Sequence, residues 1–377
     1  MTDRIEQIRS ALEAEKLDGL LISAPVDDMF GHHDENREYV SGFTGSTGYA
    51  LVTADAAIFA ADFRYVEQAE RECVPRGFAV FPALKGKKDW FPDFVRAARL
   101  QGKRVGVSAA DMSLREFAAF QKLVADLAAE ERPELVAAPA IIEDLRRRKD
   151  ATELAHIQEA IAVADRAFEA VAKALSPEMT EREAAAAFAR AVAAGGGEGI
   201  SFETIVAAGP WGAMPHAHPR DEPLGAGRPI VFDMGARYRG YCSDLTRTFV
   251  IGEADARFRE VYRIVFEAQA AAIAGVRPGM TGVDAHLLAH NLIAAHGYGE
   301  QFGHGLGHGV GLQVHEAPYL GFSSEDVLEE GMVFTIEPGI YLPGWGGVRI
   351  EDVVVLENGR ARVLSHATKL APAGASR

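Results

Sequence analysis

Five side chains in the C-terminal half of the sequence have the chemistry of metal ligands: Asp233, Asp244, His308, Glu337 and Glu351. Each lies in an apolar, strand-like segment punctuated by glycine, where an unpaired charge would be costly to bury. A carboxylate in such a place needs a cation, a partner charge or a set of hydrogen bonds. Two divalent cations need several anionic oxygens to neutralise them, so the set predicts a two-metal site.

The spacing of the first two acids predicts a hairpin. Asp233 lies in PIVFDMG and Asp244 lies in GYCSDLTRTFV, and the RYRG between them is typical of a turn. A hairpin centred near Tyr238 and Arg239 sets the two acids roughly opposite each other. The two carboxylates would then face one pocket as a pair.

The last two acids repeat this design. Glu337 ends the run MVFTIE, and Glu351 lies in GVRIEDVVVL. The turn-rich LPGWGG between them, with its centre near Gly344, pairs the two acids across a second hairpin. The alternative for any single acid is a surface position beside a turn. For the set this alternative is disfavoured, because the flanking runs have the composition of core strands.

The histidine belongs to GHGLGHGVGLQVHE, in which glycine occupies positions 303, 305, 307, 309 and 311. If the segment is a strand, one face is bare and admits a ligand or another backbone, while His304 and His308 share the other face. A single histidine is more often a core residue. Histidines at 304, 308 and 315, among so many glycines, favour a functional cluster. The glycines do not follow G-x-G-x-x-G, and the segment lacks H-E-x-x-H.

Composition limits the class of protein. With 377 residues the chain is too long for one ordinary core, so two domains are expected. Hydrophobic content of 48% and charged content of 25% are typical of a globular protein. The net charge of −15 argues against partners such as nucleic acid or an anionic membrane. Two cysteines, and no apolar signal or membrane-spanning run, predict a cytoplasmic protein.

Local patterns predict an α/β (α+β) protein. Residues 1–145 alternate helix and strand patterns, which is typical of an α/β domain. Asp150 with Glu153, and Thr180 with Glu183, predict two capped helices, the first ending near 175. Further helices are expected near 254–274 and 282–295, with strands after each helix pair. This order indicates an internal structural duplication, and the tail APAGASR is predicted to be disordered.

These segments together resemble the Xaa-Pro peptidases of the pita-bread metallopeptidase family M24, that is, aminopeptidase P and prolidase. The resemblance covers nearly the whole chain, with weak signal between about 75 and 150. It implies a creatinase/prolidase-like α/β domain over residues 1–145 and a pita-bread catalytic domain over residues 146–370. The matching segments are NREYVSGFTGSTGYALVT, AADFRYVEQA, AMPHAHP, VFDMGARYRGYCSDLTRTF, GHGLGHGVGLQVHE, GMVFTIEPGIY and GVRIED.

The resemblance also implies a role for each matching residue. The metal ligands would be Asp233, Asp244, His308, Glu337 and Glu351. Glu337 would also transfer a proton. His216 and His315 would be catalytic residues that face the substrate. His304 and Arg349 would support the site or the substrate. Oxygen-rich coordination with one imidazole favours Mn²⁺ for the two divalent ions, with Co²⁺ or Zn²⁺ as alternatives. Such ions lower the pKa of bound water and polarise the scissile carbonyl.

The implied reaction is hydrolysis of the Xaa-Pro bond at the N-terminus of a peptide with proline in second position. Prolidases cleave dipeptides and need a cationic anchor for the terminal carboxylate, often an arginine shortly after the His-Glu segment. No arginine lies between His315 and Arg349, so the sequence favours aminopeptidase P, with Xaa-Pro dipeptidase as the alternative. A non-catalytic peptide-binding protein of the same architecture is the remote alternative. The resemblance also implies a homodimer.

Overall fold

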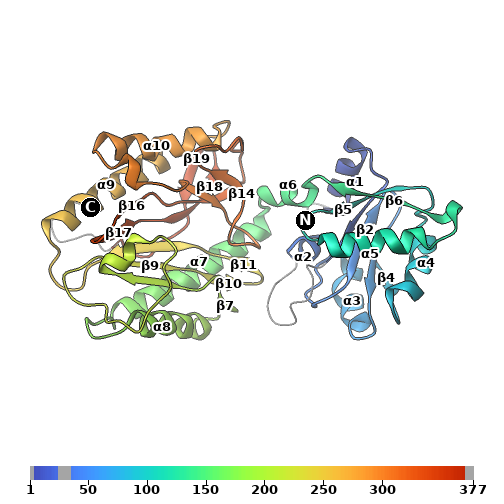
Figure 1. The fold of residues 1–377 in the computed structure, drawn as a ribbon, viewed down its shortest axis with the longest axis horizontal. Helices are drawn as coiled ribbons and strands as arrows, with labels where there is room; N and C mark the ends of the chain where they lie inside the picture. Colours follow the sequence, from blue (N-terminus) through green and yellow to red (C-terminus); the bar gives the residue numbers. More distant parts are fainter. Residues whose placement is uncertain (1–3, 24–34, 370–377) are drawn as a thin grey trace. The chain divides into compact units, whose positions relative to one another are not determined.

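A computed structural model of the chain describes residues 4–23 and 35–369, and its elements are labelled in Figure 1. The chain divides into two units, Met1–Arg146 and Arg147–Arg377. The tail APAGASR lies outside the described residues. Within the described ranges, no helix combines the length and the apolar character that crossing a bilayer requires.

A mixed sheet with strand order β4-β3-β2-β1-β5-β6 forms the centre of the described part of the first unit. β1 pairs antiparallel with β2 and parallel with β5. All four residues of β1 are buried, so its sequence GLLI is a continuous apolar run instead of an alternating one. The elements are α1 Arg4–Ala14, β1 Gly19–Ile22, α2 Glu35–Ser41, β2 Tyr49–Thr53, β3 Ala57–Ala61, α3 Val66–Glu72, β4 Ala79–Pro82, α4 Lys87–Ala97, β5 Arg104–Ser108, α5 Leu114–Ala125, β6 Glu134–Ala138 and, at the boundary, α6 Ile141–Arg147.

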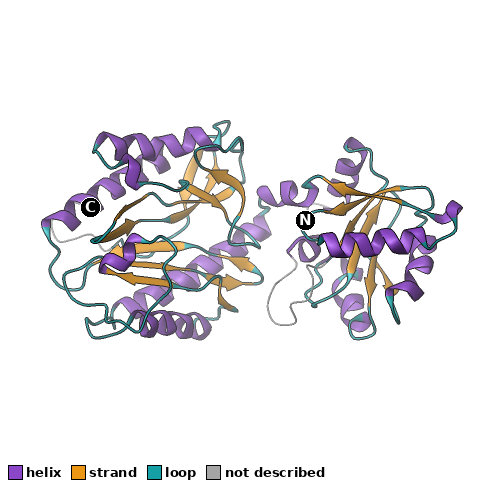
Figure 2. Ribbon diagram, in the orientation of Figure 1, coloured by secondary structure: helices purple, strands orange, loops and turns teal. Residues whose placement is uncertain are grey.

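The second unit has the predicted order of helix pair, strands, helix pair, strands (Figure 2). Two of its sheets have the strand orders β12-β9-β8 and β14-β13-β15-β18-β19. The elements are α7 Ala151–Ala172, α8 Glu181–Ala194, β7 Gly199–Ile200, β8 Ile205–Ala208, β9 Ile230–Met234, β10 Ala236–Tyr238, β11 Tyr241–Cys242, β12 Leu245–Phe249, α9 Ala256–Gly275, α10 Gly282–Ala295, β13 Gly307–Gly309, β14 Glu316–Leu320, β15 Val333–Ile336, β16 Gly339–Leu342, β17 Gly346–Arg349, β18 Asp352–Glu357 and β19 Arg360–Val363.

Side-chain caps begin the helices of this unit where the sequence predicted them. Asp150 accepts hydrogen bonds from the backbone N–H groups of Thr152 and Glu153, and the Glu153 side chain accepts one in return. Thr180 opens α8 with the same reciprocal pattern. α7 ends at Ala172, a few residues before the predicted end near 175. Such boundaries are the least certain part of a pattern-based prediction because helix ends fray.

Each helix pair covers its own sheet, and each pair has its own core. In Figure 1, α7 and α8 lie on one side of the unit and α9 and α10 lie on the opposite side. Phe232 of β9 packs against Phe168 of α7 and Phe188 of α8, with ring centroids 5.7 and 6.1 Å away. Val265 of α9 and Ile336 of β15 belong to the second core. The unit is therefore built from two halves, each with a helix pair over a sheet, in the predicted order of elements.

A buried arginine joins the two halves. Arg247 of β12 is 1% exposed, and its Nη2 lies 2.8 Å from Asp352 Oδ1 on β18. It also donates to the backbone carbonyl of Glu351. One residue further along β12, the Thr248 hydroxyl donates to the carbonyl of Arg349 at 2.8 Å. These bonds hold the 349–352 segment against β12, which brings acids from distant parts of the sequence together.

Candidate active site

The first predicted hairpin forms, but its register differs from the prediction. Asp233 of β9 lies opposite Thr246 of β12 instead of Asp244. The turn is centred on Arg239 and Gly240, whose φ angles are 48° and 78°. A type I′ turn needs positive φ at both central residues, and glycine adopts it without strain. The centre therefore moves one residue toward Gly240, which shifts the opposing residue by two.

The second hairpin has the predicted register. Ile336 pairs with Asp352, and Gly339 pairs with Arg349. The pairing on both sides therefore sets Glu337 opposite Glu351, as the centre near Gly344 predicted. The turn between β16 and β17 contains Gly344 at φ 80°, a left-handed value that glycine readily adopts.

The glycine-rich segment is a strand only over Gly307–Gly309 (β13), so it is shorter than the predicted one. Its bare positions admit neighbouring backbone. A Cβ on Gly307 would lie 2.0 Å from the carbonyl oxygen of Thr335, and a Cβ on Gly309 would lie 2.3 Å from that of Ala317. The glycines thus let β13 approach β14 and β15 closely, and this approach places His308 between the acids.

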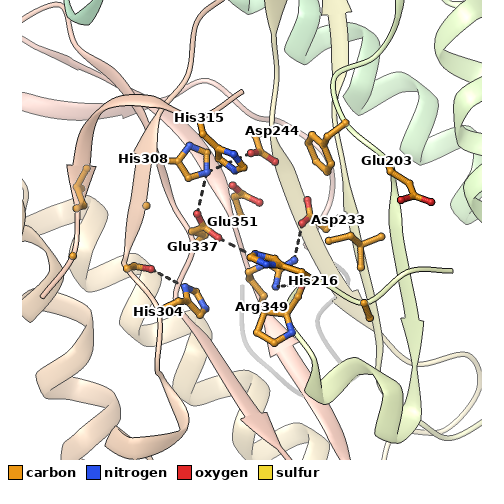
Figure 3. Close-up of a pocket in the computed structure, with 18 of the residues that line it drawn as sticks. Glu203, His216, Asp233, Asp244, His304, His308, His315, Glu337, Arg349 and Glu351 are labelled. Carbon is orange, nitrogen blue, oxygen red and sulfur yellow. Dashed lines mark hydrogen bonds and ion pairs between the residues drawn. The ribbon is translucent and has the colours of Figure 1, made fainter. Parts of the chain in front are cut away.

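The five predicted ligands converge on one pocket (Figure 3). The structure brings their atoms together in overlapping groups, in each of which one ligand atom per residue lies within 4.8 Å of the others. His308 Nε2 lies 3.3 Å from Glu337 Oε1 and 3.6 Å from Asp244 Oδ2. The groups are Asp233 with Asp244 and Glu351, His308 with Glu337 and Glu351, and Asp244 with His308 and His315.

The charge balance of this cluster favours a bound cation. Burial, reinforced by the neighbouring carboxylates, raises the pKa of Asp244 and of Glu351 well above the usual range. Burial also opposes ionisation of Glu337, but the hydrogen bond and the charge of His308, together with the charges of His304 and Arg349, outweigh that effect and lower its pKa to about 2. Like charges at this separation resist simultaneous ionisation. Divalent cations would remove that repulsion.

Two buried oxygens in the cluster have no hydrogen-bond partner, namely Asp233 Oδ1 and Glu351 Oε1. Buried oxygens without a hydrogen-bond partner are unusual in folded proteins, and binding of an ion is one of their ordinary explanations. The donor set is four carboxylates and one imidazole, which suits hard to borderline divalent metals. The residues present therefore fit the two ions that the sequence predicted.

Arg349 is held beside the acids by a complete set of partners. It is 3% exposed, and its Nη2 donates to Asp233 Oδ2 at 2.7 Å. Nε donates to the Thr246 hydroxyl at 3.0 Å, and Nη1 donates to the Tyr341 hydroxyl at 2.7 Å. Thr246 in turn donates to Glu351 Oε2 at 2.7 Å. Arg349 thus orients Asp233 and, through Thr246, Glu351.

The remaining predicted histidines line the same pocket. His304 shares a hydrogen bond of 3.0 Å with the Tyr341 hydroxyl, and burial lowers its pKa. The His315 ring stands edge-on to the His308 ring at 4.2 Å between centroids. Burial, with His308 beside it, lowers the pKa of His315 to about 4. His216 is exposed at the pocket surface.

The cavity has a volume of about 570 Å³, and part of its wall is apolar. Phe202, Ile205, Pro215 and Leu320 contribute apolar surface next to the acids. A cavity of this volume is in the range that small-molecule and peptide ligands occupy. The wall therefore suits a small apolar ring beside a polar reaction centre.

Several residues of the site were not predicted from the sequence. Thr246 and Tyr341 bond to the acids or to Arg349, and Glu203 and His218 line the rim of the pocket. Only His218 had a visible signal, because it lies two positions after His216 in HAHP. The others became apparent only from tertiary contacts.

Comparisons with known proteins agree with this geometry. The sequence profile of Metallopeptidase family M24 matches residues 155–358, and that of the Creatinase/Prolidase N-terminal domain matches residues 4–148. The chain belongs to metallopeptidase family M24. The predicted family, the enzyme class and the order of a creatinase-like domain followed by a pita-bread domain are thereby confirmed.

Individual relatives match along nearly their whole length. An Xaa-Pro dipeptidase of Pyrococcus horikoshii is 35% identical over 96% of this chain and 97% of its own. The structure of an Xaa-Pro dipeptidase from Bacillus anthracis has a TM-score of 0.90 at 34% identity, covering 98% of this chain and 99% of the other. That of an X-Pro aminopeptidase from Thermotoga maritima has a TM-score of 0.85 at 34% identity, covering 97% and 98%.

Proposed function

We propose that this protein is a metal-dependent Xaa-Pro dipeptidase. The observation that supports this proposal best is the largely buried group of Asp233, Asp244, His308, Glu337 and Glu351 around one cavity, with two oxygens that lack partners. The Xaa-Pro dipeptidases among its relatives match over nearly the full chain and support the substrate class. Family membership implies divalent ions, and we propose two, with Mn²⁺ favoured by the oxygen-rich donor set.

This proposal reverses the sequence-based preference for aminopeptidase P. The named relatives support the dipeptidase alternative better, although an X-Pro aminopeptidase is also among the similar structures. Aminopeptidase P remains the second candidate, because the one arginine among the described pocket-lining residues is Arg349, which already has its partners. The sequence-based preference rests on the absence of an arginine between His315 and Arg349, and the relatives outweigh it.

In the proposed site, Asp233, Asp244, His308, Glu337 and Glu351 hold the ions, which supply Lewis acidity for the scissile carbonyl and the attacking water. Glu337 accepts the proton of the nucleophile and transfers it to the prolyl nitrogen, which carries no N–H of its own in the peptide. Because this leaving nitrogen must be protonated, the proton donor has to be well aimed.

The proposed work of the histidines is hydrogen bonding to the reacting groups. His216 and His315 donate to the oxyanion that develops on the carbonyl oxygen, or help to move the proton. A lowered pKa keeps His315 neutral at pH 7, so it donates as an imidazole and not as a cation. His304 and Arg349 position the acids and the substrate through Tyr341 and Thr246.

A matched peptide series tests the proposal. The metal-loaded protein is assayed on Xaa-Pro, Xaa-Pro-Yaa and Xaa-Ala with the same first residue, and kcat/KM is compared. We expect kcat/KM to be higher for the dipeptide Xaa-Pro than for the tripeptide Xaa-Pro-Yaa. We also expect replacement of proline by alanine to lower kcat/KM. A clear preference for the tripeptide would make the protein an aminopeptidase P. No hydrolysis of any member, with metals bound, would favour the non-catalytic binding protein.

We further propose a cytoplasmic homodimer with domains at residues 1–145 and 146–370. The composition and the family resemblance support these points. Light scattering and cell fractionation would test the assembly and the location, and limited proteolysis would test the boundary.

A further inference from the structure

A dipeptide substrate brings a carboxylate to this pocket, and the described pocket offers few cations to meet it. Five carboxylates line the cavity, whereas Arg349 is the one arginine among the described lining residues. Arg349 already donates to Asp233, Thr246 and Tyr341 and is 3% exposed. Its use as an anchor would break those bonds. The terminal carboxylate therefore needs a different donor.

His218 has the position that such a donor requires. Its side chain lines the pocket but is 81% exposed, so it lies at the rim and not among the metal-binding acids. Its Nδ1 lies 2.8 Å from Glu203 Oε2, and Glu203 also lines the pocket. Figure 3 shows Glu203 set apart from the acid cluster, on the side of Asp233. The Nδ1 contact orients the ring and leaves Nε2 for a ligand.

The backbone of His218 is held in place by a chain of contacts that leads to a buried acid. The indole N–H of Trp211 donates to the His218 carbonyl at 3.0 Å. Arg220 lies over the Trp211 ring at 4.4 Å and donates twice to the carboxylate of Glu181, which is fully buried. A rigid backbone lowers the entropy cost of presenting one side chain to a ligand.

We propose that His218 binds the terminal carboxylate of the Xaa-Pro dipeptide, with Glu203 orienting the imidazole, an inference that rests on the proposed dipeptidase function. When Nδ1–H is donated to Glu203, Nε2 remains for an incoming carboxylate, and an imidazolium ring carries an N–H at both nitrogens. A charge-assisted hydrogen bond is roughly twice as strong as a neutral one. The contact therefore favours a free carboxylate over the neutral amide that a longer peptide has at this point.

The size of the preference is limited by exposure and by the charge of Glu203. Exposed charge pairs contribute little, because water and salt screen them. We therefore expect His218→Ala to lower kcat/KM for Xaa-Pro by about fivefold, mainly by raising KM. The effect on the C-terminal amide Xaa-Pro-NH2 should stay within about twofold, since the amide presents no charge to the rim.

The experiment uses the metal-loaded full chain and the substrate pair Xaa-Pro and Xaa-Pro-NH2. His218→Arg places a permanent cation at the same position and should recover at least half of the dipeptide preference, which a merely structural role would not allow. His296→Ala is the matched control, because this exposed histidine at the end of α10 bonds to the Leu292 carbonyl and does not line the pocket. It should leave the ratio of the two substrates unchanged.

The outcomes separate this inference from the proposed function. If the unmodified protein cleaves Xaa-Pro but His218→Ala changes both substrates equally, or neither, the pair is an ordinary surface contact and the inference is wrong. If the unmodified protein cleaves neither substrate, the dipeptidase proposal fails, and this inference fails with it. A selective loss on the dipeptide, with rescue by His218→Arg, supports both.

Discussion

At the residue scale, the site brings acids together that cannot all be ionised without a counter-charge. Asp244 and Glu351 have raised pKa values because they are buried beside other carboxylates. Substituting either with its amide removes one anionic ligand and leaves an unbalanced set for two cations. We expect Asp244→Asn or Glu351→Gln to lower bound metal toward one equivalent or less and to abolish peptidase activity.

Metal analysis by mass spectrometry and a peptidase assay on the same samples measure both effects. Glu203→Gln is the matched control, because Glu203 lines the same pocket outside the groups that could hold a metal among the described residues. It should retain full metal content. Retention of two metals and full activity in Asp244→Asn would contradict the assignment of Asp244 as a metal ligand.

The histidines separate into two roles that metal content can distinguish. His308 lies between Glu337 and Asp244, whereas His216 lines the pocket without belonging to any of the metal-binding groups of the described residues. We expect His308→Ala to lose metal. His216→Ala should keep both metals and lose roughly 10²-fold in kcat, because a hydrogen bond made in the transition state is removed. The reverse pattern of metal loss would mean that the two roles are exchanged.

The sequence could predict the ligands but not the groups that orient them. Carboxylates in apolar strands stand out, because burying them alone is costly. Thr246 and Tyr341 give no such signal in the sequence, because hydroxyl side chains are common in strands. Their hydrogen-bond partners depend on the tertiary structure. The Thr246 hydroxyl contacts Glu351 and Arg349, both more than 100 positions away in the sequence.

At the scale of elements, β13 shows how glycine positions His308. A Cβ at Gly307 would collide with the backbone of Thr335, whereas nothing lies within 4 Å of a Cβ at Gly303. Gly307→Ala should therefore push β13 from β15, destabilise the protein by about 2–3 kcal/mol and weaken metal binding. Gly303→Ala is the matched control from the same segment and should change the free energy of unfolding by less than about 0.5 kcal/mol.

Thermal unfolding and metal titration of the two glycine variants check this. Equal destabilisation by both substitutions would mean that the close approach of β13 and β15 does not position His308.

The register of the two hairpins could be predicted only in part. Pattern and turn composition predicted both hairpins, but the first centre depends on which residues adopt positive φ, and only Gly240 was a clear signal for it.

Helix α10 carries a buried histidine whose burial predicts a pH effect on stability. His286 is fully buried, packs against His290, Phe302 and Phe322, and neither ring nitrogen has a hydrogen-bond partner. Burial, with His290 and His304 nearby, lowers its pKa to about 4. As pH falls from about 6.5 to about 4, the unfolded chain binds this proton before the folded chain does.

The free energy of unfolding therefore falls by at most about 3 kcal/mol as the pH falls through that window. Above pH 6.5 this contribution to stability is fully present. His286→Leu removes the titrating group and should flatten the fall in Tm between pH 6.5 and 4.5. His296→Leu, at an exposed position, should leave the slope unchanged. Identical slopes for the unmodified protein and His286→Leu would contradict the expectation.

At the scale of the whole molecule, the order of elements could be predicted and their assembly could not. Capping boxes at Asp150 and Thr180 and the alternation of helix pairs with strands indicated two similar halves. The sequence gives no local signal that Arg247 of β12 bonds to Asp352 of β18. That pairing is long-range, and it decides which acids meet.

Metal removal should act on one unit of the molecule only. The acids and His308 all lie in the second unit, residues Arg147–Arg377, while the first unit has a separate core around Phe94 and Val107. Ligand that binds only the folded state stabilises it by about 2.7 kcal/mol at a concentration 100 times its dissociation constant. For a domain of this size, that corresponds to roughly 5–10 °C in Tm.

Calorimetry of the full chain with Mn²⁺ or with a chelator tests this. We expect the transition of the second unit to fall by roughly 5–10 °C when metal is removed, while that of the first unit stays in place. Asp244→Asn, which loses one ligand but also one repelling charge, should show a smaller shift between the two conditions. If both transitions move together, the two units unfold as one, and the metal stabilises the whole chain instead of the catalytic half alone.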